Sequence, residues 1–175
     1  MTRFGKQLHA YAGIQEGPWL YAQAYRIKLS LNAGVEGRKI ISVEIGGRLK
    51  HFRIPSRNIF KDLKKNLARF GVLEDVTLIN GSSFDAATTS AVRQILGDGE
   101  VGLFIFDADS NVRRDLDSYG DLLSDNCWVV IDDYFGPEAK AAPLRAQVDE
   151  FVAAEQLLPF GYYGWGTWVG QWQRK

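Results

Sequence analysis

The sequence is poor in the residues that build disulfide and zinc sites. Among 175 residues it has one cysteine, Cys127, and two histidines, His9 and His51. A disulfide framework is excluded, and neither histidine has a Cys or His partner at zinc-ligand spacing. Cys127 lies in the apolar run 127–131, where a free thiol behaves as a small buried hydrophobe. A reducing compartment fits this pattern, and we expect a cytoplasmic protein.

An excess of charge and long apolar segments are also missing. Lys plus Arg and Asp plus Glu number 21 each, so there is no basic excess for sequence-independent nucleic-acid binding. No segment approaches the roughly 20 apolar residues that cross a bilayer, and no apolar core of a signal peptide follows the start. There is also no Ser-centred nucleophile elbow and no phosphate-binding loop with its lysine. We expect a soluble protein with no nucleic-acid partner and no membrane partner.

What the chain does have is an apolar content of 46% and a regular alternation of strand and helix patterns. Its length is within the usual range of one domain, so we expect residues 1–175 to form a single domain. The alternation has no internal repeat. It predicts an α/β fold with a Rossmann-like, mostly parallel sheet and helices on both faces.

A strand-helix-strand unit is the clearest part of this pattern. The apolar runs Val101–Phe106 and Trp128–Ile131 are typical of central parallel strands buried on both faces. Apolar residues recur at helical spacing between them and predict an amphipathic crossover helix, the set being Val112, Leu116, Tyr119, Leu122 and Leu123. A right-handed crossover is the strong default for such a unit.

The remaining segments divide into well-marked elements and an ambiguous first third. Sequence patterns predict helices over 59–70, 86–96 and 141–155, a strand over 76–79, and a closing antiparallel hairpin from strands 157–163 and 166–172. Earlier, 8–14 reads as a strand and 18–31 as a helix. Residues 39–45 read as a strand, but 41–52 fit a hairpin turning on Gly46-Gly47 equally well.

Acidic residues follow both central strands. Asp107 ends the first, and Asp132 and Asp133 end the second. Ligands of open parallel sheets bind at the carboxyl ends of the strands, and neighbouring strands lie roughly 5 Å apart. Crowded carboxylates repel unless a cation bridges them, and oxygen ligands favour Mg²⁺, Mn²⁺ or Ca²⁺ over zinc. We therefore predict a divalent-metal site at these three residues; the alternative is that the acids cap the next helix or turn, as Asp109 also would.

The residues around these acids resemble a known family. The run from Phe104, F-I-F-D-A-D-S-N, and the run from Val130, V-I-D-D-Y-F-G-P, resemble the second half of class I S-adenosylmethionine-dependent methyltransferases. The likeness is strongest to metal-dependent O-methyltransferases that act on sugar and natural-product hydroxyls. In that group an acid closing the fourth strand and an Asp-Asp pair closing the fifth bind the metal, positions that carry over to Asp107, Asp132 and Asp133. The acid two residues after the first often serves as general base, and Asp109 holds that place.

The resemblance also implies cofactor-binding positions. The glycine-rich turn of the family is matched by Gly13 and Gly17, although Tyr11 stands where an acid is usual. The acid that binds the ribose hydroxyls corresponds to Glu44, because a carboxylate can accept from both. The adenine would lie near Ser82 and Ser83. The resemblance is good over residues 59–172 and poor over residues 1–58.

The activity that this resemblance implies is methyl transfer from S-adenosylmethionine to a hydroxyl of a sugar or small natural product. A divalent metal would lower the pKa of the hydroxyl, Asp109 would accept its proton, and the oxygen would attack the sulfonium methyl in line. Two alternatives stay open: a degenerate methyltransferase fold used for binding or assembly, and a metal-dependent glycosyltransferase using Asp107-x-Asp109. The expected partner is a small-molecule acceptor, and a homo-oligomer is compatible with the sequence.

Overall fold

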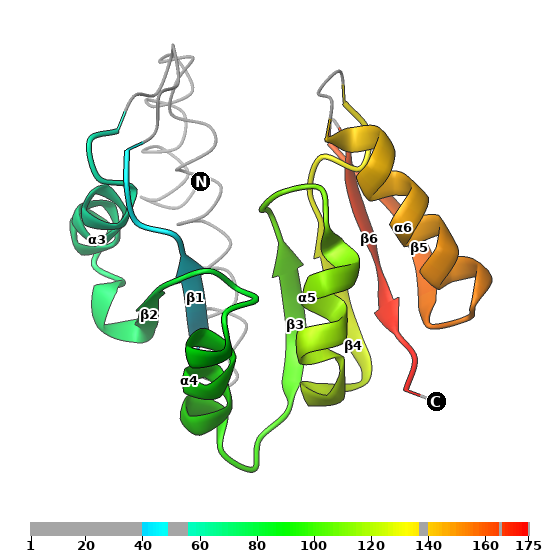
Figure 1. Cartoon of the computed structure of the whole chain (residues 1–175), viewed down its shortest axis with the longest axis horizontal. Helices are drawn as coiled ribbons and strands as arrows, with labels where there is room; N and C mark the ends of the chain where they lie inside the picture. Colours follow the sequence, from blue (N-terminus) through cyan, green and yellow to red (C-terminus); the bar gives the residue numbers. More distant parts are fainter. Residues whose placement is uncertain (1–39, 49–55, 137–139, 165, 175) are drawn as a thin grey trace, which may run out of the picture. The chain divides into compact units, whose positions relative to one another are not determined.

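The computed structural model describes residues 40–48, 56–136, 140–164 and 166–174. The chain divides into two compact units, residues 1–88 and 89–175, with the boundary inside helix α4 (Ala86–Leu96). Figure 1 shows the elements along the chain. The expected strand at 8–14 and helix at 18–31 lie outside the described residues, and the expectation of a single domain stays a prediction. In the ranges described, no helix is long and apolar enough to cross a bilayer.

A pair of parallel strands forms the centre of the first unit. Strand β1 (Ile40–Glu44) pairs with β2 (Val76–Asn80), in a register that places Ile40 beside Val76 and Glu44 beside Asn80. The prediction that residues 39–45 form a strand is thus confirmed, with the strand spanning Ile40–Glu44. The second half of the alternative hairpin falls on residues 49–52, which lie outside the described residues.

Helix α3 (Ile59–Arg69) connects these two strands. It begins after Asn58, whose side-chain oxygen accepts a hydrogen bond from the Lys61 amide at 2.8 Å and so satisfies a backbone donor of the first turn. The helix is followed by a single 3-10 turn, Leu73–Asp75. A small apolar cluster joins the helix to the strands, with Leu67, Val72 and Val76 as its buried members.

The second unit is built on a four-stranded sheet in the order β3-β4-β6-β5. Strands β3 (Val101–Phe106) and β4 (Leu123–Ile131) are parallel, whereas β6 (Thr167–Trp172) runs antiparallel to both β4 and β5 (Leu157–Tyr163). Parallel strand pairs followed by a closing antiparallel hairpin confirm the predicted α/β fold class.

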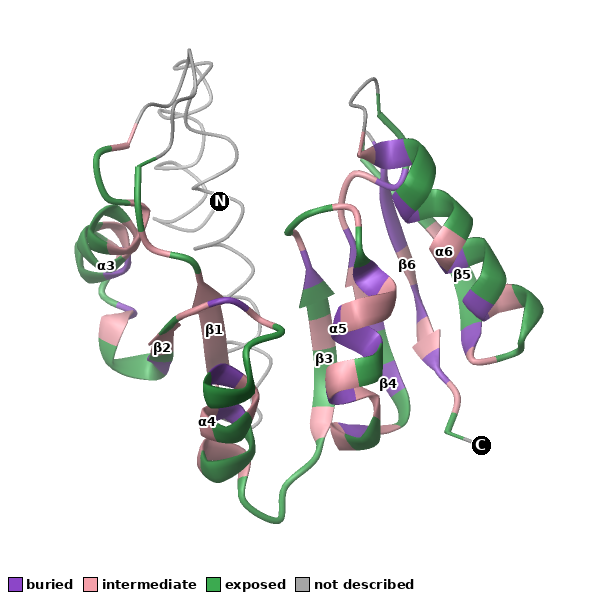
Figure 2. Cartoon of the chain, in the orientation of Figure 1, coloured by how far each residue is buried: buried purple, intermediate pink, exposed green. Residues whose placement is uncertain are grey.

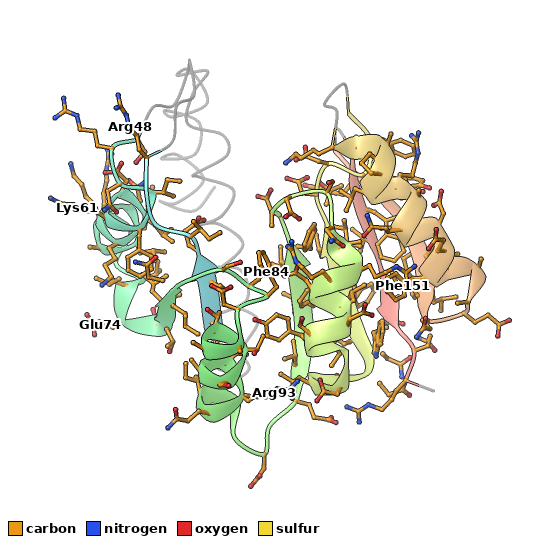
Figure 3. All side chains as sticks on the ribbon, viewed as in Figure 1. Arg48, Lys61, Glu74, Phe84, Arg93 and Phe151 are labelled. Atoms are coloured by element: carbon orange, nitrogen blue, oxygen red, sulfur yellow. The ribbon has the colours of Figure 1, made fainter. Side chains whose placement is uncertain are left out.

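Helices α5 (Val112–Tyr119) and α6 (Ala141–Ala153) share one apolar core with this sheet. Side chains along β4 alternate, because Cys127 and Val129 are buried while Trp128, between them, is 42% exposed. The Phe151 side chain of α6 belongs to the same core (Figure 3). Within the described part of this unit, the helices that pack on the sheet therefore lie on one face, and Figure 2 shows exposed positions along β3.

The crossover helix is shorter than its apolar spacing predicted. Helix α5 ends at Tyr119, a 3-10 turn spans Gly120–Leu122, and Leu123 already begins β4 with no exposed surface. Glycine is a poor helix residue, and a Cβ at Gly120 would lie 3.2 Å from the Trp172 ring. Strand β4 begins before the apolar run 128–131. The apolar pattern did not predict its first half, because residues 124–126 are polar.

Arg174 contacts residues at the amino ends of both β3 and β4. Arg174 donates hydrogen bonds to the Leu123 carbonyl at 2.7 Å and the Asp121 carbonyl at 3.2 Å, and it forms an ion pair with Glu100 at 2.8 Å. Glu100 precedes β3 and Leu123 begins β4. These contacts therefore lie at the end of the sheet opposite the acids that follow β3 and β4.

Candidate functional site

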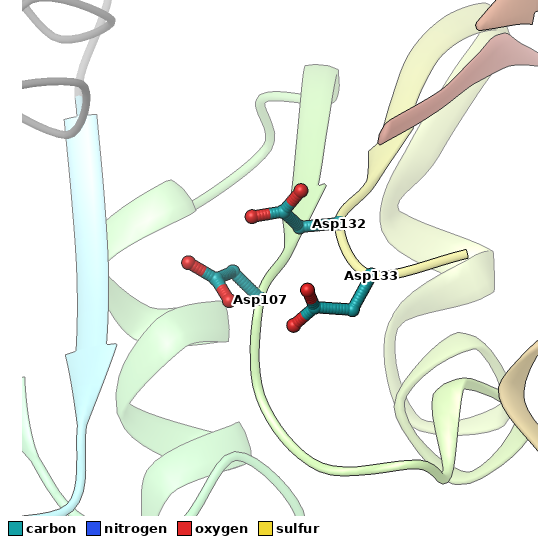
Figure 4. A group of neighbouring side chains, drawn as sticks. All are labelled: Asp107, Asp132 and Asp133. Atoms are coloured by element: carbon teal, nitrogen blue, oxygen red, sulfur yellow. The ribbon is translucent and has the colours of Figure 1, made fainter. Parts of the chain in front are cut away.

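Three carboxylates converge at the carboxyl ends of β3 and β4. In the register of this parallel pair Phe106 lies beside Ile131, so Asp107 and Asp132 are the next residues on neighbouring strands. The Asp132 amide donates to the Phe106 carbonyl at 2.9 Å, which continues the pairing to this point. One carboxylate oxygen each from Asp107, Asp132 and Asp133 lies within 4.8 Å of the others (Figure 4). The structure thus brings together the three residues predicted as metal ligands.

The backbone of Asp133 explains how two consecutive acids reach one point. Side chains of adjacent residues in a strand point to opposite faces. Asp133 instead has a left-handed backbone with φ +57, a conformation that Asp tolerates better than most residues. The chain turns sharply there, and both carboxylates face the same space.

Thr167 and Lys140 hold two of these carboxylates. The buried Thr167 hydroxyl, at the start of β6, donates to Asp132 Oδ1 at 2.6 Å. Lys140, which directly precedes α6, places its ammonium 2.5 Å from Asp133 Oδ2 and 3.4 Å from the Ala108 carbonyl. Sequence patterns did not indicate either residue, because each reaches its carboxylate through a tertiary contact, Thr167 from β6 and Lys140 from the residue before α6. The signal for Thr167 was a polar residue at the start of an otherwise apolar strand.

The donor set is suited to a hard divalent cation. Three partly buried carboxylates offer anionic oxygen ligands and no sulfur or imidazole, which favours Mg²⁺, Mn²⁺ or Ca²⁺ over softer metals. Asp132 Oδ1 accepts the Thr167 hydrogen bond, and the carboxylate keeps further lone pairs that can face a cation. The residues present therefore fit a divalent ion.

Asp109, the predicted general base, is not a member of this group. Its carboxylate accepts a hydrogen bond from the Asn111 amide at 2.9 Å and pairs with Arg114 at 3.1 Å. Partial burial raises its pKa, but the Asn111 hydrogen bond and Arg114 outweigh that effect and hold the pKa of Asp109 below its usual value. Asn111 itself caps α5 through the Arg114 amide. An Asp107-x-Asp109 metal site, as in the glycosyltransferase alternative, gains no support from this arrangement.

One predicted cofactor residue, Ser82, lines an open hollow of the first unit. The hollow has a volume of about 420 Å³ at the carboxyl ends of β1 and β2, and its lining includes Gly46, Asn58, Asn80 and Ser82. Ser82 Oγ is buried and has no hydrogen-bond partner among the residues that the structure describes. The side chain of Asn80 accepts from the Gly46 amide at 2.9 Å and holds the two strand ends together.

The other predicted cofactor residues have different positions. Glu44 is the last residue of β1, and its carbonyl accepts from the Gly81 amide at 3.1 Å, but it is not among the residues that line the hollow. Ser83 follows Ser82 in the chain and does not line the hollow either. Gly13 and Gly17 lie outside the described residues. The structure thus places Ser82 in the lining of an open hollow, and the cofactor roles stay predictions.

Known structures resemble this chain, although its sequence does not identify a family. No protein-family model matches the sequence, and no curated protein matches it. A putative caffeoyl-CoA O-methyltransferase from Staphylococcus aureus superposes with a TM-score of 0.63 at 13% identity, over 98% of this chain and 93% of that one. Cofactor-bound Rv0187 from MTB gives a TM-score of 0.59 at 18% identity, over 86% of this chain and 68% of that one.

A third similar structure is a complex with SAM. The O-methyltransferase TomG from Streptomyces achromogenes, in complex with SAM, gives a TM-score of 0.58 at 13% identity, over 88% of this chain and 69% of that one. This chain spans 64% of the length of two other such neighbours, from Klebsiella pneumoniae and Bacillus cereus. At these identities the likeness concerns the fold. The chain has the fold of the class I S-adenosylmethionine-dependent methyltransferases.

Proposed function

We propose that this protein transfers a methyl group from S-adenosylmethionine to a hydroxyl oxygen. The observation that carries the proposal is the convergence of Asp107, Asp132 and Asp133 at the carboxyl ends of the parallel strands β3 and β4. In open α/β sheets this edge is where ligands bind. The O-methyltransferases among the structural neighbours include complexes with SAM and SAH, which supports the choice of cofactor.

The proposed cofactor contacts use the strand ends of the first unit. Ser82 lines the hollow with a buried hydroxyl and would hydrogen-bond the adenine. Ser83 is the next residue in the chain, and Glu44 ends β1 beside Asn80. A carboxylate at the position of Glu44 would accept hydrogen bonds from both ribose hydroxyls. Gly13 and Gly17 complete the proposed set through a close backbone approach to the cofactor.

The acidic group would hold a divalent ion, with Mg²⁺ as the first choice and Mn²⁺ or Ca²⁺ as alternatives. Asp107, Asp132 and Asp133 would be its ligands, and Thr167 would keep the Asp132 carboxylate in one orientation. When bound, such an ion supplies Lewis acidity that makes an acceptor hydroxyl easier to deprotonate. The protein's own part is to orient the acceptor oxygen toward the methyl group, and positioning of this kind accounts for much of the rate in two-substrate reactions.

Asp109 stays the candidate general base. Its carboxylate pairs with Arg114 in the absence of an acceptor, so the proposed role requires this exposed pair to open when the substrate binds. Catalytic hydrogen bonds often form only in the substrate complex, and the ion pair alone does not decide the role. Asp109→Asn would remove the base and keep the Asn111 hydrogen bond. If Asp109 is the base, kcat falls by about 10²–10⁴ with little change in stability.

The acceptor class rests on the sequence resemblance. We propose a hydroxyl of a sugar or a small natural product, in a cytoplasmic protein with neither a nucleic-acid nor a membrane partner. Screening acceptors follows naturally once cofactor binding has been measured.

Calorimetric titration tests the proposal directly. The full chain is titrated with S-adenosylmethionine and with its demethylated product, each with and without Mg²⁺. Saturable binding of both is expected. Absence of binding at millimolar ligand would contradict the proposed activity and favour a degenerate fold used for binding or assembly.

The proposed metal ligands are tested by melting the protein with and without Mg²⁺. Asp132→Asn keeps an acceptor for Thr167 but removes a charge, so we expect it to lose the Mg²⁺-dependent rise in melting temperature. Asp117→Ala, which removes an exposed acid of α5, is the matched control and should retain that rise. An equal Mg²⁺ response in Asp132→Asn and in the parent chain would remove Asp132 from the ligand set.

A further inference from the structure

A lysine ammonium lies against one carboxylate of the acidic group. Lys140 Nζ is 2.5 Å from Asp133 Oδ2 and 3.4 Å from the carbonyl of Ala108, the residue after Asp107. One side chain thus contacts the segments that follow both β3 and β4. Three carboxylates within 4.8 Å of one another repel strongly, and a positive charge at this point lowers that repulsion.

Lys140 is also able to leave. Its side chain is 30% exposed and that of Asp133 is 33% exposed, so both partners of the ion pair are in contact with solvent. A lysine carries its charge on a flexible four-carbon stem and binds as a point charge, without the planar fork that would fix an arginine in place. The ammonium therefore has two positions available at low cost, one against the carboxylate and one in water.

We infer that Lys140 is a tethered cation that occupies the acidic group when no divalent ion is bound and is displaced when one binds. This inference rests on the proposed metal site and assigns a residue that sets how tightly the ion is held. In the ion-free protein Lys140 stabilises the strand ends. On binding, the ion must overcome the lysine pair, so its affinity is lower than the three carboxylates alone would give.

The expected size of the effect follows from charge. Separating two unit charges that lie roughly 3 Å apart, at water-like screening, changes the binding constant by about tenfold. Replacing Lys140 by methionine, which keeps the length of the side chain and removes the charge, should tighten binding by about that factor. Replacing it by arginine keeps the charge and should leave binding unchanged or weaker.

The experiment is a calorimetric titration of the full chain with Mn²⁺ alone, with parallel melting curves in a chelator. We expect Lys140→Met to bind Mn²⁺ about tenfold more tightly than the parent chain, to melt at a lower temperature in chelator, and to gain more stability from Mn²⁺. Lys140→Arg should bind no more tightly than the parent chain. Lys65→Met, at an exposed position of α3, controls for a general loss of positive charge and should change neither quantity.

Several outcomes would overturn the inference. Equal or weaker Mn²⁺ binding in Lys140→Met would do so, as would similar tightening in Lys140→Arg or in the Lys65→Met control. Absence of Mn²⁺ binding in every variant would also refute it. A separate titration with S-adenosylmethionine distinguishes this failure from failure of the proposed function, because cofactor binding without Mn²⁺ binding leaves methyl transfer standing and removes the competing lysine.

Discussion

The backbone contact between Gly166 and Phe135 gives the sharpest stability prediction. Gly166 has φ +152, and a Cβ built on it would lie 2.0 Å from the Phe135 carbonyl oxygen. Its own carbonyl accepts from the Phe135 amide at 3.1 Å, so the two segments cannot separate without losing a hydrogen bond. In Gly166→Ala the backbone conformation costs about 1–3 kcal/mol. Displacing the Phe135 segment costs a further 1–3 kcal/mol or so.

Gly164→Ala is the matched control for this variant. Gly164 also has a positive φ, +61, but a Cβ there would meet no atom within 4 Å. The control should therefore cost about 1–2 kcal/mol from its left-handed backbone alone. Urea unfolding followed by tryptophan fluorescence measures both variants against the parent chain. If Gly166→Ala loses no more stability than Gly164→Ala, the close approach of the two backbones is not as described.

Three further predictions concern the core and the support of the acids. Thr167→Val keeps the shape of the buried side chain but removes the hydrogen bond to Asp132, so urea unfolding should show a loss of about 1.5–3 kcal/mol. Leu144→Ala, at a core position with 1% exposure, should lose about 2–5 kcal/mol by the same assay. Burial raises the pKa of Cys127 to about 11, so the thiol should react with a thiol reagent only after unfolding. Its contribution to stability is complete below the unfolded thiol pKa of about 8.5 and is lost as the pH rises through about 11, which alkaline unfolding measures.

The central part of the site was predictable because it depends on local patterns. Apolar runs followed by acids identified β3, β4 and the three carboxylates, since carboxyl ends of neighbouring parallel strands must meet at one edge. Ser82 was placed by its position after β2. These are short-range features of the sequence.

The supporting contacts were not predictable, for a physical reason. Thr167 and Lys140 approach the acids only through the pairing of β6 with β4 and through the position of α6, and no local pattern encodes such tertiary contacts. The length of β4 was missed because its first half is polar, and the ion pair of Asp109 with Arg114 needed the helix geometry of α5. Sequence patterns therefore predicted the clustered acids better than the residues that contact them.

The contacts of Arg174 suggest that stability and chemistry can vary independently in this protein. Arg174 joins Glu100 and Leu123 at one end of β3 and β4, whereas Asp107 and Asp132 follow the same strands at the other end. In each strand, the contact with Arg174 and the acid therefore lie at opposite ends. Substitutions near the acids therefore leave intact the Arg174 contacts that hold β3 and β4 together at their other end.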